Sequence, residues 1–458
     1  MATTVLILVL TAACAREPAL VSRPSGASRS LVLRNVRVFD APRATLLEGL
    51  RDVVVRDGRI AAIGPPGLAA AGLREIDGRG GTLLPGLVDV HTHTGSTPNP
   101  PWKIALLPDV GENLSAFLYA GVTTVLDLGN LSPAVFQERE KLATGAHLGP
   151  HLYAAGPIFT EPGGHPAEVL RAWLPWYLRW YVLPRAVREV ATPDEARRAV
   201  EALLPEHPDV LKLAIDAGAT DVPRLAPETI AAIATAGHAA GVRSIAHVGS
   251  SAEAVDAVRA GVDALAHSPW RDELTDEAVA LIATARVPVV VTLAIWDVAE
   301  GPRPSFLPIE HEVARPDVMV ALLAPPPSRD AATAAFLRAV AAGHDARRRN
   351  VAKLRAAGVT ILAGSDASNA GHFPGAGLHL ELAKMVEAGL TPGEALRAAT
   401  WENARFLAGE AAEFGETAVG KRADLVLVAG DPTARIDELG RITQVVLDGT
   451  VLERRARR

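Results

Sequence analysis

Cysteine is almost absent from this chain: a single residue, Cys14, occurs among 458. An intramolecular disulfide is therefore impossible, and a zinc site built on cysteine thiolates is excluded. Positive charge is not in excess either, because 46 Lys and Arg are set against 52 Asp and Glu, which gives a formal net charge of -6. No basic stripe interleaved with aromatic residues occurs, so nucleic acid is not an expected partner. The composition favours a small molecule as the partner.

Long uncharged apolar runs are absent after the first 14 residues, so no later segment has the length of a membrane span. The early run, "VLILVLTAAC" at residues 5–14, is typical of the apolar region of a secretory signal peptide. Its end, "LTAAC", resembles a bacterial lipobox, in which Cys14 would carry lipid at the mature N-terminus. The alternatives are an ordinary signal peptide with an incidental cysteine, or an incorrectly placed start, since "MATT" contains no Lys or Arg. We expect residues 1–30 to be a signal peptide and tether, and the protein to be an exported bacterial lipoprotein of the periplasm or cell envelope.

Both ends of the remaining chain are rich in β-branched residues. "SLVLRNVRVFD" and "RDVVVRDGRIAAIG" lie near the N-terminus, and "KRADLVLVAGD" and "ITQVVLDGTVLERR" near the C-terminus. Asp57-Gly58 and Asp448-Gly449 are hairpin signals within these segments. We expect residues 31–84 and 416–458 to pack together as one small β domain.

Between these ends, over residues 85–415, short buried runs alternate with Ala-rich helical stretches. The runs are "GLVDVHTH", "VTTVLDLG", "HLYAAG", "DVLKLAID", "VRSIAHV", "DALAHS", "VPVVVTL" and "VTILAGSD". Several follow a glycine that ends a helical segment, as in "AVRAGVDALAHS". No G-x-G-x-x-G phosphate loop follows the first run, which argues against a doubly wound nucleotide-binding sheet. Eight strand and helix units predict an α/β fold of the (β/α)₈ barrel type.

Polar side chains that can bind a metal stand at the ends of these runs, where catalytic groups of a barrel are placed. His91 and His93 end the first run, and the strand period of two puts both imidazoles on one face. The other runs add further donors near their ends: Lys212 in the fourth, His247 in the fifth, His267 in the sixth and Asp366 in the eighth. Nitrogen and oxygen ligands of this kind suit Zn²⁺, Mn²⁺, Fe²⁺ or Co²⁺.

Each of these residues has another explanation when taken alone. A single His-x-His pair is a weak signal, His247 is compatible with a hydrogen-bonded core histidine, and Asp366 with a helix N-cap. Lys212 is compatible with a side chain that points out of the barrel. The chain has 13 His, however, and four of them fall at strand ends that were identified without reference to histidine. Their joint placement favours a metal site.

The motifs resemble those of the amidohydrolase superfamily, in particular its imidazolonepropionase-like branch with metal-dependent Xaa-Pro dipeptidases. They occur in order as "LPGLVDVHTH", "GVTTVLDLGN", "GPIFTEPGGH", "LKLAID", "IAHV", "GVDALAHS", "LAGSDAS" and "GKRADLVLVAGDP". The similarity extends from about residue 31 to the C-terminus. It implies a (β/α)₈ barrel with a β-sandwich formed by both ends of the chain.

The resemblance also implies a role for each candidate residue. Five ligands would form two metal sites: His91, His93 and Asp366 for one ion, His247 and His267 for the other. Lys212 stands where binuclear members carry a carboxylated lysine that bridges both ions. The two divalent ions, expected to be zinc, would activate water for attack on a carbonyl group. Asp366 would take the proton of this water and pass it to the leaving nitrogen, so that a C–N bond is hydrolysed.

The substrate is less determined than the metal site. His165, in "EPGGHP", matches a family motif that faces the site, and we expect it to contact the substrate. Related dipeptidases often carry a tyrosine just after the fifth-strand histidine, whereas this chain has "HVGSS". The expected substrate is a small amide or peptide, as in a dipeptidase, with a non-peptidic amide, lactam or ester as the alternative. A metal-free binding scaffold is a remote alternative, because relatives of that kind have usually lost ligands.

Residues 171–190, "RAWLPWYLRWYVLPRAVREV", form an unusual aromatic segment. It contains Trp173, Trp176 and Trp180, three of the seven tryptophans of the chain, together with Tyr177 and Tyr181. Aromatic residues at near-helical spacing indicate internal packing or the interface of a homo-oligomer. A lid over the metal site and a membrane-contacting face are the alternatives.

Overall fold

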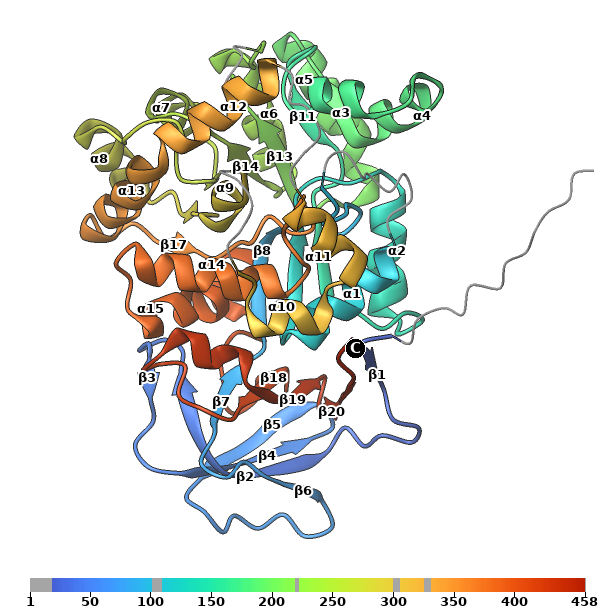
Figure 1. Cartoon of the computed structure of the whole chain (residues 1–458), viewed down its shortest axis with the longest axis vertical. Coiled ribbons are helices and arrows are strands. Elements are labelled where there is room, and N and C mark those ends of the chain that lie inside the picture. The colour runs from blue at the N-terminus through green and yellow to red at the C-terminus, as the bar shows by residue number, and fades with distance from the viewer. Residues whose placement is uncertain (1–18, 101–108, 219–221, 300–304, 325–330, 458) are drawn as a thin grey trace, which may run out of the picture.

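The computed structural model describes residues 19–100, 109–218, 222–299, 305–324 and 331–457. Cys14 and the apolar run before it fall outside this part, so the expected signal peptide and lipid anchor stay predictions. Figure 1 shows a larger part in which helices surround parallel strands, and a β-rich part below it. None of the described helices is long and apolar enough to cross a membrane.

The β-rich part is one sheet that contains strands from both ends of the chain. Its nine strands run in the order β20-β19-β18-β7-β2-β4-β5, with β3 and β6 paired to β2. Their bounds are Leu31–Asp40 (β2), Thr45–Leu46 (β3), Arg51–Arg56 (β4), Arg59–Gly64 (β5), Arg74–Asp77 (β6), Thr82–Pro85 (β7), Leu425–Val428 (β18), Ile442–Leu447 (β19) and Thr450–Val451 (β20). The two ends meet where β7 pairs antiparallel with β18.

The two predicted Asp-Gly turns connect neighbouring strands of this sheet. Asp57 and Gly58 join β4 to β5 with φ of 50° and 82°, and Asp448 and Gly449 join β19 to β20 with φ of 50° and 78°. Positive φ at both central residues matches the twist of a two-residue hairpin, which is why this dipeptide is favoured there. A second, two-stranded sheet pairs β1 (Val21–Ser22) with β21 (Glu453–Arg454).

The eight predicted runs each contain a strand, and these strands are parallel to their neighbours. They are Leu87–Thr92 (β8), Val122–Asp127 (β9), His151–Ala154 (β10), Val210–Ala214 (β13), Arg243–His247 (β14), Ala264–Ala266 (β15), Val289–Val290 (β16) and Ile361–Leu362 (β17). Gly241 and Gly261, with φ of 72° and 85°, end the helices before β14 and β15, as the helix–glycine–strand pattern predicts.

Two short strands were not predicted. Ile158–Thr160 (β11) and Val187–Glu189 (β12) follow β10, and β11 pairs with both β12 and β13. The parallel strands therefore form a three-stranded sheet, β10-β9-β8, and a seven-stranded sheet, β12-β11-β13-β14-β15-β16-β17. Strands of three residues are too short to show a periodic pattern, so this insertion could not be predicted from the sequence.

Hydrogen bonds and a common core connect the two parallel sheets. Val90 N donates to Ala363 O at 3.3 Å beyond the end of β17, and Asp209 N donates to Ala154 O at 2.9 Å before the start of β13. One apolar cluster takes a buried residue from each of the eight strands or from the residue that follows it: Val90, Leu126, Ala155, Val210, Ile245, Ala264, Val290 and Leu362. The division of the chain at residues 31–84, 85–415 and 416–458 remains a prediction.

Helices cover the outside of the parallel strands. They are Val110–Tyr119 (α1), Ala134–Ala143 (α2), Ala167–Trp173 (α3), Trp176–Ala186 (α4), Pro193–Leu203 (α5), Pro227–Ala239 (α6), Ser251–Arg259 (α7), Asp276–Ala285 (α8), Ala294–Ala299 (α9), Pro308–Val313 (α10), Pro316–Leu323 (α11), Ala331–Ala342 (α12), His344–Ala356 (α13), Ala376–Glu387 (α14), Pro392–Arg397 (α15) and Asn403–Ala408 (α16). A second and larger apolar cluster includes buried residues of both strands and helices, such as Leu213 and Ile233.

Candidate metal centre

The carboxyl ends of β8 and β17 bring His91, His93 and Asp366 together from distant parts of the sequence. Beyond β17 the chain continues beside β8, since Asp366 N donates to His91 O at 2.7 Å and His93 N donates to Ala367 O at 2.5 Å. Asp366 itself adopts a φ of 58°, in the left-handed region that few non-glycine residues occupy. This backbone geometry sets the Asp366 side chain between the two imidazoles.

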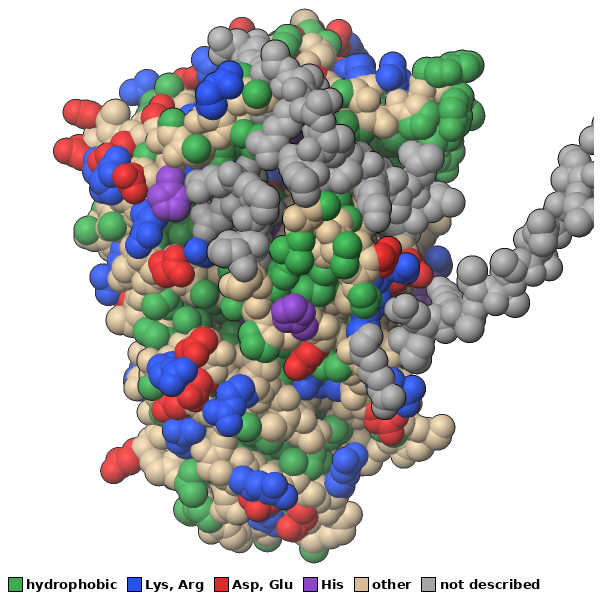
Figure 2. Space-filling model, in the orientation of Figure 1, with side chains coloured by type: hydrophobic (Ala, Val, Ile, Leu, Met, Phe, Trp, Pro, Cys, Tyr) green, Lys and Arg blue, Asp and Glu red, His purple; other side chains and the backbone are tan. Residues whose placement is uncertain are grey.

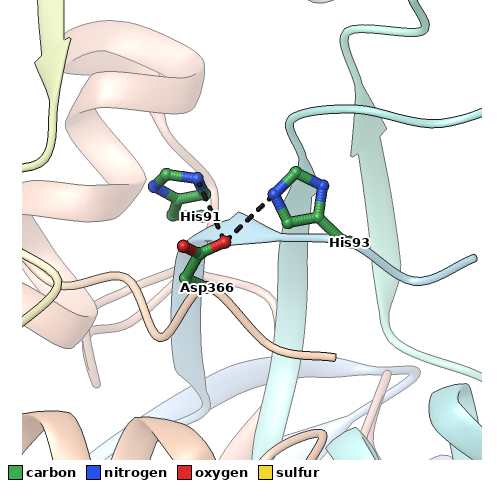
Figure 3. A group of neighbouring side chains, drawn as sticks. All are labelled: His91, His93 and Asp366. Carbon is green, nitrogen blue, oxygen red and sulfur yellow. Dashed lines mark ion pairs between the residues drawn. The ribbon is translucent and has the colours of Figure 1, made fainter. Parts of the chain in front are cut away.

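Figure 3 shows the Asp366 carboxylate between the two histidine rings. One of its oxygens, Oδ1, lies 3.0 Å from His93 Nε2 and 3.5 Å from His91 Nε2. The opposite nitrogen of His93, Nδ1, lies 3.1 Å from the carbonyl oxygen of Gly129. Because a carbonyl only accepts, Nδ1 carries a proton, and Nε2 is the nitrogen that faces Asp366 and the site.

Lys212, His247 and His267 come from the three neighbouring strands β13, β14 and β15. In the register of the sheet, Ala214 pairs with His247 and His247 with Ala266. Val210 belongs to the apolar cluster shared by the eight strands, and the period of two puts Lys212 on the same face of β13. His267 follows β15 with a φ of 73°, so the backbone turns at the point where its ring enters the site.

Five histidines form a continuous row across the strand ends. The ring centroids of successive members are separated by 5.5 Å for His93 and His91, 4.7 Å for His91 and His267, and 4.3 Å for His267 and His247. His165 ends the row, 5.1 Å from His247. The structure therefore brings all the predicted histidines into one site; their roles as ligands remain predictions.

Burial keeps most of these imidazoles neutral. Desolvation, with the positive charge of Lys212 and of neighbouring histidines, lowers the pKa of His91 and His267 well below the usual histidine value. Desolvation also lowers the pKa of His247, although Asp216 opposes this shift. A neutral imidazole has the free lone pair that metal coordination requires.

His93 and Asp366 behave as a pair. Burial opposes the charged form of each, but their mutual hydrogen bond and charge outweigh it, so the pKa of His93 is raised and the pKa of Asp366 is lowered. The charge of Lys212 also lowers the pKa of Asp366. Asp366 is therefore an anion at neutral pH, as a ligand or a proton acceptor must be.

Lys212 is buried within this site, with 2% of its surface exposed. Desolvation lowers the pKa of its ammonium group to about 7, against the opposing charge of Asp366. Its Nζ has no hydrogen-bond partner among the described residues, nor has His91 Nδ1. An amine of this kind is expensive to bury, so the side chain is not explained by packing alone.

These observations fit a metal centre. The donors are imidazole nitrogens and one carboxylate oxygen, the set that zinc and similar divalent ions prefer. Ligand atoms of His91, His93 and Asp366 all lie within 4.8 Å of one another. Carboxylation of Lys212 would convert the buried amine, which has no hydrogen-bond partner among the described residues, into an anion between several histidines. That negative charge would offset the positive charge of two ions.

His165 lies at the rim of the site, in the loop between β11 and α3. Its Nδ1 is 3.0 Å from Glu168 Oε1, and about a third of the side chain is exposed. Glu168 is an acceptor, so it fixes the ring with a proton on Nδ1 and leaves Nε2 with a lone pair. The placement beside His247 agrees with the expected contact to a substrate, which remains a prediction.

Three aspartates near the site were missed in the sequence. Asp89 accepts from His91 N at 3.2 Å and from Ser365 Oγ at 2.5 Å, and burial raises its pKa to about 7. Asp127 accepts from Thr94 Oγ1 at 2.5 Å beside the loop that follows β8. Each is the polar residue at or near the end of a buried run, a signal that does not by itself show which face the side chain occupies.

Asp216, the third, holds His247 in place. Its Oδ2 accepts from Trp270 Nε1 at 2.7 Å and lies 3.1 Å from His247 Nε2. Burial opposes ionisation, but His247, Arg271 and Trp270 hold the pKa of Asp216 well below its usual value. Because the carboxylate only accepts, His247 donates from Nε2 and its Nδ1 lone pair is left for a cation.

Asp216→Asn should weaken zinc binding about 10–100-fold, because partners that orient a ligating histidine have effects of this size. The amide retains the shape of the side chain, but it no longer imposes a single tautomer on His247. Chelator competition measures the affinity. The matched control is Asp256→Asn on α7, which alters an ion pair with Arg224. An affinity equal to that of the control would show that Asp216 does not position His247.

A second group of potential ligands lies at the opposite ends of the strands. His151, at the start of β10, has Nε2 at 3.4 Å from Asp424 Oδ2 and 3.5 Å from Asp448 Oδ1. Arg422 Nε lies 2.5 Å from Asp424 Oδ2. The guanidinium already supplies the positive charge that a metal would bring, so this group links the parallel strands to the β-rich part through ion pairs.

The sequence of the chain is similar to the sequences of known proteins. Residues 82–452, most of the chain, match the model of the amidohydrolase family. Among curated proteins, the dihydroorotase of Elusimicrobium minutum is 32% identical over 104 residues, which are 23% of this chain and 22% of that protein. Adenine deaminase 3 of Rhizobium johnstonii is 41% identical over 68 residues, 15% of this chain and 11% of that protein. The chain thus aligns with a small share of the length of these relatives.

Solved structures resemble the chain over nearly its whole length. A Xaa-Pro dipeptidase with bound methionine has a TM-score of 0.75 at 22% identity, with 92% of this chain and 99% of that chain covered. A prolidase complexed with N-methylphosphonate-L-proline has 0.75 at 24%, with 93% and 100% covered. The A. niger ochratoxinase has 0.68 at 20%, with 92% and 95% covered. At these identities the likeness concerns the fold.

Proposed function

Because the chain belongs to the amidohydrolase family, as its sequence motifs predicted, we propose that it is a metal-dependent hydrolase of a C–N bond in a small amide or peptide. One observation carries the proposal. Neutral histidines from several strand ends converge with an ionised Asp366 and with Lys212, which is buried and has no hydrogen-bond partner among the described residues. A binding scaffold has no need for this combination of buried donors.

Six residues would hold two divalent ions, which we expect to be zinc: His91, His93 and Asp366 one, His247 and His267 the other, with carboxylated Lys212 between them. Ions in such a set make water nucleophilic near neutral pH and polarise a carbonyl group. Nδ1 of His247, and Nε2 of His93 once it has released its proton, are the nitrogens that would coordinate the ions, because their opposite nitrogens bind Asp216 and the carbonyl oxygen of Gly129. Lys212 must be neutral to be carboxylated, and its burial favours that form.

Asp366 is the proposed proton carrier. Its carboxylate is ionised and its Oδ1 accepts from Asn369 Nδ2 at 2.8 Å, which fixes its orientation. As a base it would take a proton from the attacking water, and as an acid it would return that proton to the leaving nitrogen. His165 would bind the substrate through Nε2 from the opposite end of the histidine row.

The segment after β14 bears on the choice of substrate. Gly249 N donates to Glu253 Oε2, and a Cβ at this glycine would lie 2.3 Å from Asp216 Oδ1, a side chain fixed by three partners. A tyrosine that holds a substrate carboxylate is absent from "HVGSS". A dipeptide fits the structural neighbours, whereas this segment favours the second candidate, an amide, lactam or ester without a free carboxylate.

A substrate screen tests the activity. The full chain, loaded with zinc, is offered dipeptides including Xaa-Pro, N-acyl amino acids and lactams, and hydrolysis is followed by mass spectrometry. We expect turnover of at least one class, lost after chelation and restored by zinc. Equal turnover before and after complete metal removal would contradict metal dependence, and zinc-loaded protein without turnover of any class would favour the scaffold.

We infer further that the eight parallel strands close into a (β/α)₈ barrel. The shared apolar cluster and the hydrogen bonds from Val90 to Ala363 and from Asp209 to Ala154 support closure. We also infer that the nine-stranded sheet of the β-rich part folds over itself as a sandwich, since one apolar cluster takes residues from both of its ends, such as Val53 and Val446.

We also propose export as a lipoprotein through Cys14, supported by the lipobox-like sequence. Mass spectrometry of the mature protein tests the anchor: a lipid on wild type that is absent from Cys14→Ser would support it.

A further inference from the structure

The hairpin of helices α3 and α4 displays an apolar surface that the proposed function does not use. Of nine exposed large hydrophobic side chains among the described residues, five lie on it: Trp173, Trp176, Tyr177, Trp180 and Tyr181. Trp176 is 79% exposed and Trp180 is 74% exposed. Figure 2 shows hydrophobic side chains projecting at the upper right, where Figure 1 places α4. Patches of this kind on a folded surface usually mark an interaction site.

Packing within the protein does not account for this surface. None of the 11 residues of α4 is buried. The aromatic rings contact each other instead, edge to face, with centroids 5.9 Å apart for Trp176 and Tyr177 and 5.8 Å apart for Trp180 and Tyr181. The spacing of four residues places the two pairs along one side of the helix.

The identity of the side chains suits a lipid interface. Every exposed large hydrophobic side chain of the hairpin is Trp or Tyr. These residues combine an apolar body with one polar group and concentrate at the boundary between headgroups and acyl chains. An interface between protein chains uses such residues too, but its centre is normally supplemented by buried aliphatic side chains. Here the aliphatic residues Leu178, Val182 and Leu183 of α4 are half-buried.

The charge of the hairpin is complementary to anionic lipid. Helix α4 contains no acidic residue. Arg179 and Arg185 donate to backbone oxygens of Leu174 and Tyr181, at 3.0 and 2.9 Å, and pair with no carboxylate of the described residues. Basic side chains close to an anionic membrane surface are attracted to it and strengthen the contact.

The hairpin is fixed to the rest of the molecule. Glu189 at the end of β12 accepts from Arg171 of α3 at 2.5 Å and from the backbone N of Gly163 at 2.7 Å. These bonds connect β12 to α3 and to the loop that precedes α3. In Figure 1, α4 and β1, where the described chain begins, both lie toward the right-hand side. The point where the described chain begins and the aromatic surface therefore lie on the same side of the molecule.

We propose that the α3–α4 hairpin docks on an anionic phospholipid bilayer, with Trp176 and Trp180 at the headgroup boundary. This contact is additional to the proposed anchor at Cys14 and independent of the hydrolytic site. The hairpin and the anchor would contact the membrane at two separate points, and together they would fix the orientation of the molecule on the membrane.

Vesicle binding of the full chain tests the proposal, in the Cys14→Ser background that removes the proposed lipid. The vesicles contain phosphatidylglycerol and phosphatidylethanolamine, with phosphatidylcholine alone as the uncharged arm. Trp176→Ser/Trp180→Ser should reduce binding about tenfold or more, whereas Val320→Ser/Val419→Ser, which alters exposed apolar residues elsewhere, should not. Substrate hydrolysis in solution should be the same for all three proteins.

Brominated lipids separate this contact from any binding by residues 5–14, because they quench only tryptophans that reach the bilayer. We expect quenching in the Cys14→Ser protein and its loss in the double tryptophan variant, with an unchanged circular dichroism spectrum in both. No quenching, or quenching that survives the double substitution, overturns the proposal. So does a stable dimer that the double substitution converts to monomer without change in vesicle binding, since a second copy would then cover this face.

Discussion

Asp366→Asn should lower kcat/KM by about 10²–10⁴-fold, the range for loss of a general acid–base group. The amide has nearly the shape of the carboxylate and retains an oxygen toward His93 Nε2, which lies 3.0 Å from Asp366 Oδ1 in the wild type. It cannot take a proton from water, and it removes the negative charge beside His91 and His93. Steady-state kinetics at saturating zinc separate the loss of proton transfer from weaker metal binding.

The matched control is Asp437→Asn, which alters an exposed carboxylate paired with Arg435. This variant should keep wild-type kinetics, and both should unfold at nearly the wild-type temperature. Activity of Asp366→Asn within threefold of the control, at full metal content, would assign proton transfer to another group. Asp89 would then be the next residue to test, since its pKa of about 7 also suits that task.

Lys212→Ala should remove most of the activity and at least one of the two metal ions. The wild-type amine is buried without a hydrogen-bond partner among the described residues, which indicates that its functional form is a different one. Carboxylation supplies an anion that offsets the charge of both ions, and alanine cannot be carboxylated. Metal content by mass spectrometry and kcat with added zinc are the two measurements.

Chemical rescue distinguishes a bridging role from a structural one. The space left by Lys212→Ala can accept a small carboxylic acid such as formate or acetate, which should restore part of the activity and the second ion. Lys212→Met fills that space with an apolar chain of similar length and should not be rescued. Full activity of either variant with both ions bound would refute the carboxylated lysine.

The metal ligands were predictable because their signal is chemical and local. Histidine is uncommon, and four of 13 stand at the ends of runs that also read as buried strands. For Asp366 and Lys212 the residue types left other roles open, and the resemblance to a family decided between them. The burial of Lys212 was not readable, since "VLKLAID" is compatible with either face of the strand.

What the sequence could not show depends on contacts between distant segments. Asp216 and Asp127 look like any polar residue at a strand end until the neighbouring strands are placed. The insertion of β11 and β12 has too few residues for a periodic signal, yet it carries the loop with His165 and the aromatic hairpin. The spacing of Trp176 and Trp180 predicted a helix, but only the tertiary structure shows that this helix buries nothing.

The metal content of active protein tests the central claim most directly. The full chain is purified without chelator, and its divalent metals are counted by mass spectrometry before and after His91→Ala/His93→Ala substitution. We expect close to two ions per chain, a loss of at least one in the variant, and hydrolysis that follows the ion count. Active wild-type protein that contains no divalent metal and is unaffected by chelators would contradict the claim.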